Sequence, residues 1–186
     1  MKTRALALAK GLLALGLLVL FGVTAVVPGA RASVGSVDKS SLDYKVHREL
    51  VTLPWYGVFD NLEYQVSGSQ VILTGQVVSE HGQTKYDAAN AVKRIPGVTE
   101  VVNKIEVLPP LPFDNQIRRA EYRAIFSQST LGGYSMGTLP QIRIIVNGGH
   151  VTLEGTVMNQ MDRNIAGLAA NSVPNVFSVT NNLKVG

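Results

Sequence analysis

Apolar residues recur along the chain at two spacings, and the order of these spacings predicts its secondary structure. Over residues 42–53 they recur every three to four positions, as on one face of a helix, and Pro54 ends the pattern. Over residues 62–77 they alternate with polar residues on either side of a turn at Gly68 and Ser69. This alternation predicts a β-hairpin with one buried face.

The pattern continues with a second helix and a last strand. Residues 86–95 place apolar side chains on one side of a helix, which Pro96 and Gly97 close. Residues 101–107 alternate again. The predicted order is helix, strand, strand, helix, strand. The apolar face of the second helix consists of Ala88, Ala91, Val92 and Ile95.

The chain repeats this order once, with two blocks of residues in corresponding places. The hairpin block recurs after 80 residues and the last-strand block after 78, so the second copy is two residues shorter between them. A repeat of this length is a small domain and not one unit of a solenoid. The matching hairpin positions are Val71, Leu73, Gly75 and Val77 with Val151, Leu153, Gly155 and Val157.

Helical spacing predicts two helices in the second copy as well. The face of its first helix is predicted to carry Phe113, Ile117, Ala120 and Ala124. The face of its second helix is predicted to carry Met161, Ile165, Leu168 and Ala169. We expect domains at residues 40–107 and 113–186, separated by a stiff proline-rich linker at 108–112 that contributes little core.

The first 32 residues have the pattern of a secretory signal. A basic start is followed by an apolar run over residues 11–27, and Ala30-Arg31-Ala32 provides a cleavage site. We expect cleavage after Ala32, a short linker at 33–39, and a periplasmic protein. The alternative is an uncleaved anchor, since the run is near the lower limit of the ~17–25 residues that span a bilayer.

Removing this segment changes the charge of the chain. The whole sequence has 17 basic and 13 acidic residues, and residues 1–32 hold four of the basic ones, which leaves 13 of each sign. This balance argues against nucleic-acid binding. The chain contains no cysteine, which excludes disulfides, thiolate catalysis, cysteine zinc sites and a lipidated N-terminal cysteine.

The repeated motif resembles the BON domain of bacterial envelope proteins. Its last-strand block, Val98, Val101, Asn103, Ile105 and Val107, is matched by Val176, Val179, Asn181, Leu183 and Val185. Two copies behind an export signal resemble the periplasmic, osmotically inducible Y type of this family. The resemblance implies two α+β modules, each a small mixed three-stranded sheet packed on two helices.

The resemblance also implies a function. Members of the family bind phospholipid surfaces or envelope proteins and support tolerance of envelope and osmotic stress, without catalytic residues or a cofactor. In the second copy Asn175 stands where the first has Gly97. We expect a left-handed backbone there, which asparagine tolerates.

A cluster of arginines is the first candidate for a functional surface. Residues 38–107 carry a net charge of −2 and residues 113–186 a net charge of +2. Arg118, Arg119 and Arg123 lie on the first helix of the second copy, where they could dock anionic lipid headgroups. Asp114 and Glu121 lie beside them and weaken the attraction, so the alternative is a solvated helix face.

An aromatic loop is the second candidate. Residues 53–59 include Trp55, the only tryptophan, together with Tyr56 and Phe59. Such a loop can insert into a membrane interface or capture apolar segments of a partner protein. We interpret it first as a cap that folds back over a small core, because modules of this size need aromatic burial.

Two apparent catalytic or metal-binding patterns carry little weight. Residues 133–137 fit the G-x-S-x-G motif around Ser135, yet no strand precedes it, Pro140 interrupts the required helix, and His150 lies on a hairpin turn. Asp43 and His47 share a helix face, with His81 as the one further ligand in that copy. A surface ion pair between Asp43 and His47 is the simpler interpretation. Gly148-Gly149 is a hairpin turn and not a phosphate loop, since no helix follows it.

The sequence therefore predicts a peripheral, non-enzymatic envelope protein that binds anionic phospholipid. The alternative is a chaperone-like binder of periplasmic or outer-membrane polypeptides, for which the exposed aromatic loop would be the contact surface.

Overall fold

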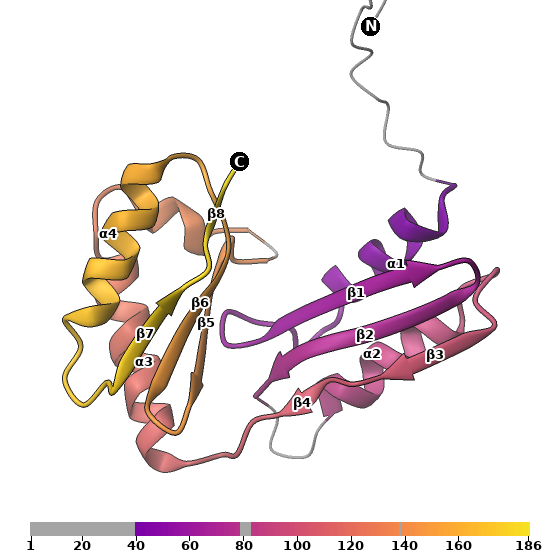
Figure 1. Ribbon diagram of the computed structural model, residues 1–186, viewed down its shortest axis with the longest axis horizontal. Helices are drawn as coiled ribbons and strands as arrows, with labels where there is room; N and C mark the ends of the chain where they lie inside the picture. The colour runs from indigo at the N-terminus through magenta and orange to yellow at the C-terminus, as the bar shows by residue number, and fades with distance from the viewer. Residues whose placement is uncertain (1–39, 79–82, 138) are drawn as a thin grey trace, which may run out of the picture. The chain divides into compact units, whose positions relative to one another are not determined.

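The computed structural model describes residues 40–78, 83–137 and 139–186 of the chain. The predicted signal segment, the linker at 33–39 and His81 lie outside the described residues. The described residues form two α+β modules, here called the first module (residues 42–107) and the second module (residues 112–185), which confirms the predicted fold class (Figure 1). Both belong to one compact unit.

The first module begins with helix α1 (Leu42–Val51), which the side chain of Ser41 caps by accepting from the amide of Tyr44. Strands β1 (Asn61–Ser67) and β2 (Gln70–Val77) form the predicted antiparallel hairpin. Helix α2 (Gln83–Lys93) leads to β3 (Glu100–Asn103) and β4 (Glu106–Val107), which both pair with β2 in parallel. The predicted last strand is thus interrupted once.

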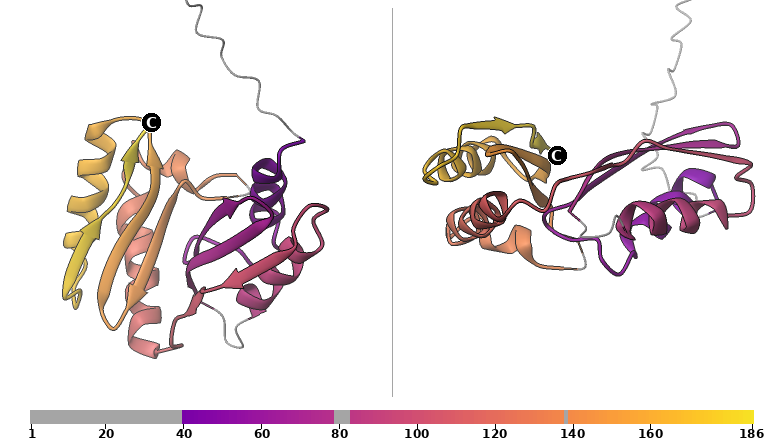
Figure 2. Two further views of the ribbon diagram at one scale, coloured as in Figure 1. Left: turned by 45° about the vertical axis from the view of Figure 1, so that its right-hand side comes forward. Right: turned by 90° about the horizontal axis from the view of Figure 1, so that it is seen from below.

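The second module repeats this topology. Helix α3 (Pro112–Phe126) is followed by a short 3-10 turn, η1 (Gly132–Ser135), and by the hairpin of β5 (Ile142–Asn147) and β6 (His150–Val157). Helix α4 (Gln160–Asn171) precedes β7 (Ser178–Asn181) and β8 (Lys184–Val185), which pair with β6 in parallel. In the first module, the helices α1 and α2 cover one face of the sheet (Figure 2).

An asparagine explains the break in the last strand of both modules. The side chain of Asn103 donates to the carbonyl of Lys85 on α2 at 2.9 Å and accepts from the amide of Ile105. In the second module, Asn181 donates to the carbonyl of Arg163 at 2.8 Å and accepts from the amide of Leu183. The asparagine of the repeated motif therefore ties the last strand to the preceding helix.

Two backbone positions confirm expectations from the repeat. Asn175 has a φ of 68° and is the one non-glycine residue with positive φ in the described part of the chain, which confirms its left-handed conformation. Gly155 has a φ of 123°, and a Cβ there would collide with the carbonyl oxygen of Gln141. The glycine of the hairpin motif is required because the neighbouring strand end lies against its Cα.

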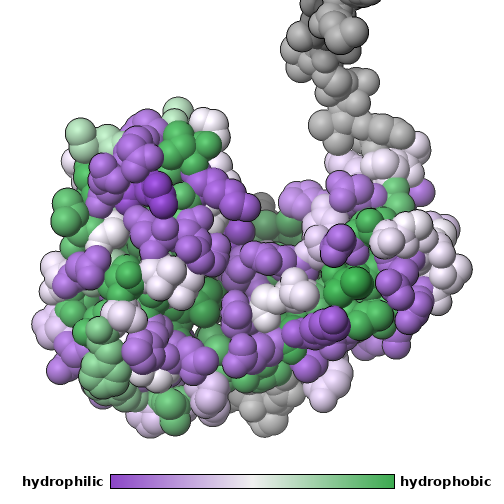
Figure 3. Space-filling model, viewed as in Figure 1, coloured by the Kyte–Doolittle hydropathy of each residue, from purple (hydrophilic) through white to green (hydrophobic). Residues whose placement is uncertain are grey.

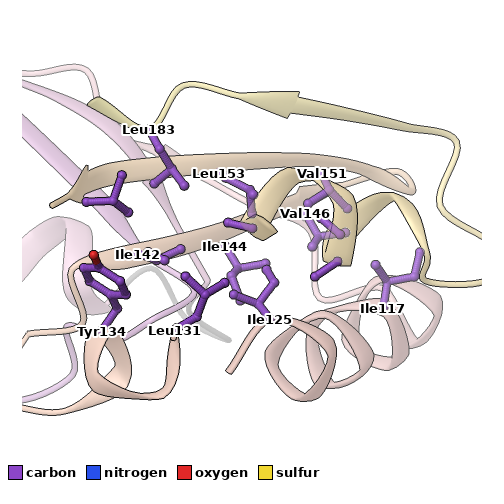
Figure 4. Close-up of a cluster of buried hydrophobic side chains, with 14 residues drawn as sticks. Ile117, Ile125, Leu131, Tyr134, Ile142, Ile144, Val146, Val151, Leu153 and Leu183 are labelled. Carbon is purple, nitrogen blue, oxygen red and sulfur yellow. The ribbon is translucent and has the colours of Figure 1, made fainter. Parts of the chain in front are cut away.

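The core of the second module lies between its sheet and its helices. Side chains of β5 and β6 point toward α3, and Leu131 and Tyr134 close one end of the cluster (Figure 4). The buried face of α4 consists of Asp162, Ala166, Ala169 and Ala170. Of the face predicted for this helix, Ala169 is buried and Ile165 packs against the core, but Met161 and Leu168 are exposed, so the prediction was wrong for these two residues.

The buried face of α3 also differs from the prediction. Phe113 is exposed, and the buried residues are Asp114, Ile117, Arg118, Glu121 and Ile125. The linker prediction was wrong at one end, because Leu108 is buried and its amide donates to the carbonyl of Val77 at 2.9 Å. This part of the linker belongs to the core of the fold.

Candidate functional site

Of the three predicted arginines, Arg118 does not lie on the surface. Its side chain is 2% exposed. One guanidinium nitrogen donates to Oδ1 of Asn115 at 2.7 Å, and the other donates to the carbonyl of Val146 at 2.6 Å. Burial lowers the pKa of the Arg118 guanidinium, while the charges of Asp114 and Asp60 raise it. The prediction of Arg118 as a lipid contact is therefore corrected: this residue is structural.

Arg119 and Arg123 remain exposed on the same helix. The Nε of Arg119 donates to the carbonyl of Asn115 at 3.2 Å. Asp114 is fully buried, and its two carboxylate oxygens accept from the amides of Gly148 and Gly149, both at 2.9 Å. This neighbouring acid therefore turns inward and does not neutralise the two exposed guanidinium groups.

The second acidic neighbour, Glu121, is also fully buried. Neither of its carboxylate oxygens has a hydrogen-bond partner among the described residues. Burial raises the pKa of the Glu121 carboxyl to about 8, because a charge without a partner is costly in an apolar interior. Glu121 holds its proton at neutral pH and adds no negative charge to the surface around the arginines.

The aromatic loop divides into exposed and packed residues. Trp55 is 70% exposed, so the interpretation of the loop as a cap was wrong for this residue. Tyr56 packs against the core of the first module, and its hydroxyl accepts from the amide of Leu62 at 3.2 Å. Phe59 packs against the core of the second module, so the cap interpretation holds for Tyr56 on one core and for Phe59 on the other.

The segment at Val58 and Phe59 lies directly against the second module. The carbonyl of Val58 accepts from the amide of Ile144 on β5 at 2.8 Å, and the Phe59 ring lies 6.5 Å from the ring of Tyr122 on α3, centroid to centroid. Asp60 fixes the segment, since its carboxylate accepts from the amides of Gly57 and Val78. Burial raises the pKa of Asp60, although these two bonds lower it.

These contacts form a shallow pocket. It has a volume of about 290 Å³ and is lined by Val58, Phe59, Arg119, Tyr122 and Arg123. Its lining is apolar except for two guanidinium groups, and no acidic residue takes part. Such a pocket can bind a negatively charged group that is attached to an apolar body.

The pocket joins two features that were separate in the sequence. Phe59 comes from the aromatic loop, and Arg119 and Arg123 come from the arginine cluster. Two residues here were not predicted from the sequence: Tyr122, whose tilted ring lies 4.9 Å from the ring of Phe126, centroid to centroid, and Asp60, which holds the loop. A polar residue directly before a predicted strand, such as Asp60, is a weak signal that its side chain holds a loop.

Apolar and polar residues are interspersed on the face of the molecule shown in Figure 3.

The serine motif lacks the geometry of a nucleophile elbow. Ser135 ends the short turn η1, and its hydroxyl donates to the carbonyl of Gly132 at 2.8 Å. His150 bonds through Nδ1 to the hydroxyl of Ser178 at 2.7 Å. The tyrosine of the motif, Tyr134, is buried with its hydroxyl 2.6 Å from a carboxylate oxygen of Asp162. The motif is part of a core-closing loop.

The histidine on α1 is exposed and lies against an aromatic ring. The His47 ring lies 6.4 Å from the ring of Tyr64, and the Tyr64 hydroxyl donates to the backbone carbonyl of Asp43. The expected ion pair between Asp43 and His47 is not formed; within the described ranges the ion pair is Arg48 with Glu49, at 3.4 Å. In the same ranges no group of three or more acidic or histidine residues could hold a metal ion.

None of the helices in the described part of the chain has the length and apolar character needed to cross a membrane.

Solved structures with some similarity include the C-terminal domain of CdsD, a structural protein of the type III secretion system of Chlamydia trachomatis. It is 9% identical, with 82% of this chain and all of that chain covered and a TM-score of 0.31. A second CdsD structure is 10% identical, with 78% and 92% covered and the same TM-score. Similarity this weak carries no argument about function.

No curated protein matches the sequence. The finer likeness to the osmotically inducible Y type therefore stays a prediction. The model of the BON domain matches residues 37–109 and residues 135–186, one match in each module. These matches cover both hairpins and both last strands of the repeat. The chain belongs to the BON domain family and contains two BON domains in tandem.

Proposed function

We propose that the protein binds anionic phospholipid surfaces as a peripheral component of the bacterial envelope. The observation that carries this proposal is the pocket at α3, in which Arg119 and Arg123 stand beside an apolar floor. A lipid phosphate would lie against the two guanidinium groups, and the adjoining acyl region would contact Phe59 and Tyr122. BON domains are linked to such membrane surfaces, which supports the assignment.

The expected strength of the contact follows from its charges. A basic residue near an anionic membrane surface contributes about 1 kcal/mol, and this contribution falls within a Debye length as salt is added. Two arginines therefore account for about 2 kcal/mol, or roughly a thirtyfold change in the binding constant. Apolar contact with Phe59 would add a part that salt does not weaken.

Co-sedimentation with vesicles tests the proposal. Residues 33–186 are expected to sediment with anionic vesicles at low salt and much less with zwitterionic ones. Arg119→Ala/Arg123→Ala should reduce binding roughly thirtyfold. The matched control, Lys93→Ala/Arg94→Ala, removes the same charge from exposed positions at the end of α2. Absence of binding to anionic vesicles, or equal loss in both double variants, would contradict the proposal.

Export and stress tolerance belong to the same proposal. The signal pattern of residues 1–32 supports a periplasmic location for the mature chain, where it would meet anionic lipid without a lipid anchor of its own. Mass measurement of protein recovered from the periplasm should give a chain that starts at Ser33. A chain that keeps residues 1–32 and stays with the inner membrane would support the anchor instead. Growth of a deletion strain in high osmolarity tests the stress role.

A second candidate, chaperone-like binding of envelope polypeptides, is favoured by the exposed apolar side chains of the chain. Trp55 is largely exposed, and Met161 and Leu168 stand out from α4, the latter 72% exposed. Trp55 is the only tryptophan, so its emission reports on this loop alone. A blue shift on adding an unfolded outer-membrane polypeptide, without binding to anionic vesicles, would favour this candidate. An unchanged emission would count against it.

A further inference from the structure

The first strands of the two hairpins occupy the same place in their modules but have different outer edges. In each hairpin, every second residue turns its backbone N–H and C=O away from the partner strand. In β1 these residues are Leu62, Tyr64 and Val66, and the equivalent residues in β5 lie 80 positions later, at Ile142, Ile144 and Val146.

The outer edge of β5 is closed by the chain itself. The amide of Ile144 donates to the carbonyl of Val58 at 2.8 Å, and the carbonyl of Val146 accepts from Arg118 at 2.6 Å. Ile144, Ile145 and Val146 are all buried. A neighbouring strand therefore cannot add to this edge, which is how folded proteins avoid unwanted sheet extension.

The outer edge of β1 lacks this protection. The amide of Leu62 donates to the Tyr56 hydroxyl, but the outward N–H and C=O groups of Tyr64 and Val66 have no partner among the described residues. The strand pairs with β2 in unbroken register, without a bulge, and contains neither lysine nor proline. A bulge, a lysine or a proline is what usually prevents another strand from pairing with an edge. Glu63 is its one charged residue.

We propose that β1 is an interface between two copies of this chain, paired antiparallel about a two-fold axis at Tyr64. In this register the N–H and C=O of Tyr64 bond to the same groups of the second copy. The N–H of Val66 donates to the carbonyl of Leu62 of the second copy, whose own amide is already used. The two sheets then form one continuous sheet, and the interface is isologous.

The side chains favour a second copy as the occupant of this edge. The register places Leu62 opposite Val66, two apolar residues on the core face, and Tyr64 opposite itself. On the exposed face, Glu63 lies opposite Gln65 of the second copy, so an acid meets an amide and no like charges face each other. The strand is therefore complementary to itself in shape, in hydrogen bonding and in charge.

This register gives a test in which two substitutions at one residue act in opposite directions. Gln65 is exposed, so its replacement leaves the module core intact. Gln65→Lys faces Glu63 of the second copy twice per dimer and should tighten the dimer about fivefold, and Gln65→Glu should weaken it by a similar factor. Sedimentation velocity of residues 33–186, from about 5 µM to 1 mM, measures the dissociation constant.

Amide exchange locates the interface. The amides of Tyr64 and Val66 should become protected as concentration rises, whereas the already bonded amide of Ile144 should not change. Val66→Pro removes an outward N–H donor without breaking a hydrogen bond to β2, so it should abolish the dimer. If this variant misfolds, the opposite effects expected of Gln65→Lys and Gln65→Glu still test the interface.

A monomer at all concentrations would overturn the proposal. So would a dimer that ignores both Gln65 variants, or protection of Tyr64 and Val66 that is independent of concentration, which would indicate another occupant. The result is independent of lipid binding, since Arg119→Ala/Arg123→Ala should dimerise normally.

Discussion

The guanidinium of Arg118 lies 2.6 Å from the carbonyl oxygen of Val146, and both groups are buried. This bond satisfies an outward-facing carbonyl at the edge of β5. The adjacent Asp114 carboxylate satisfies the two amides of the Gly148-Gly149 turn. Charged side chains of α3 thus make the backbone hydrogen bonds that a neighbouring strand would make at the edge of β5, and they also bond the free amides of the turn. An anion cannot enter the glycine turn, because a carboxylate of the chain already occupies its amides.

Arg118→Ala should destabilise the second module by about 3 kcal/mol, because it leaves the Val146 carbonyl unbonded and removes a positive charge that interacts with Asp114 and Asp60. Arg119→Ala, at the neighbouring exposed position, should cost less than about 0.5 kcal/mol. Urea denaturation followed by circular dichroism measures both values. Equal and small losses would mean that the buried guanidinium contributes no net stability.

Glu121 should make the protein more stable in mild acid than at pH 8. Burial raises the pKa of its carboxyl from 4.5 to about 8 in the folded chain. Between these pH values the unfolded chain has lost the proton and the folded chain keeps it. Stability therefore falls as pH rises from about 4.5 to 8, by a few kcal/mol in total, and is flat outside this window.

Glu121→Gln removes the titrating group while keeping its shape, so this part of the pH dependence should disappear. The free energy of unfolding at pH 5 and pH 8 measures the effect in both proteins. The wild-type difference should shrink markedly in the variant; an unchanged difference would assign the pH dependence to other groups, among them Asp60, whose pKa burial also raises.

Gly155→Ala should destabilise the second module by about 3 kcal/mol, since the new methyl group would meet the Gln141 carbonyl and the backbone has a φ of 123°. Gly133→Ala is the matched control, because nothing lies within 4 Å of its added Cβ. Thermal melting of both variants tests this. Similar melting temperatures would show that the strand end moves aside without cost.

Asn181→Ala should cost about 2 kcal/mol, because it removes the bond to the Arg163 carbonyl and the bond from the Leu183 amide. The adjacent Asn182 bonds to Glu154 at the exposed surface, and Asn182→Ala should cost less than about 0.5 kcal/mol. Hydrogen exchange at the Leu183 amide should accelerate only in the first variant. Acceleration in both would indicate general loosening of the strand.

The repeat made much of the fold predictable, and it could have corrected one error. Shifting the correctly predicted face of α2 by 78 residues gives Ala166, Ala169 and Ala170, which are the buried apolar residues of α4. Helical spacing alone favoured Met161 and Leu168, because large apolar residues usually lie inside. Here small alanines let the helix approach the sheet, and the larger side chains remain exposed.

The candidate site was predictable only in part. Exposed arginines and an aromatic loop were recognisable, yet which residues are exposed depends on bonds between distant segments. Arg118 differs from Arg119 by one position on α3, and only packing against β5 decides that the first is buried. Spacing along a helix assigns charges to the solvent side, and it cannot count the unbonded backbone groups that a buried charge will satisfy.

The sequence alone was enough to predict the two modules, their element order and the left-handed backbone at Asn175, since these depend on local sterics and on the period of apolar residues. The folded structure fixed the rest, including the strand breaks at Asn103 and Asn181, where each side chain bonds to a carbonyl of the preceding helix. It brought Phe59 to Arg119 and Arg123, buried Glu121, closed the edge of β5 and left that of β1 open. These outcomes depend on contacts between residues far apart in the chain, which no local pattern encodes.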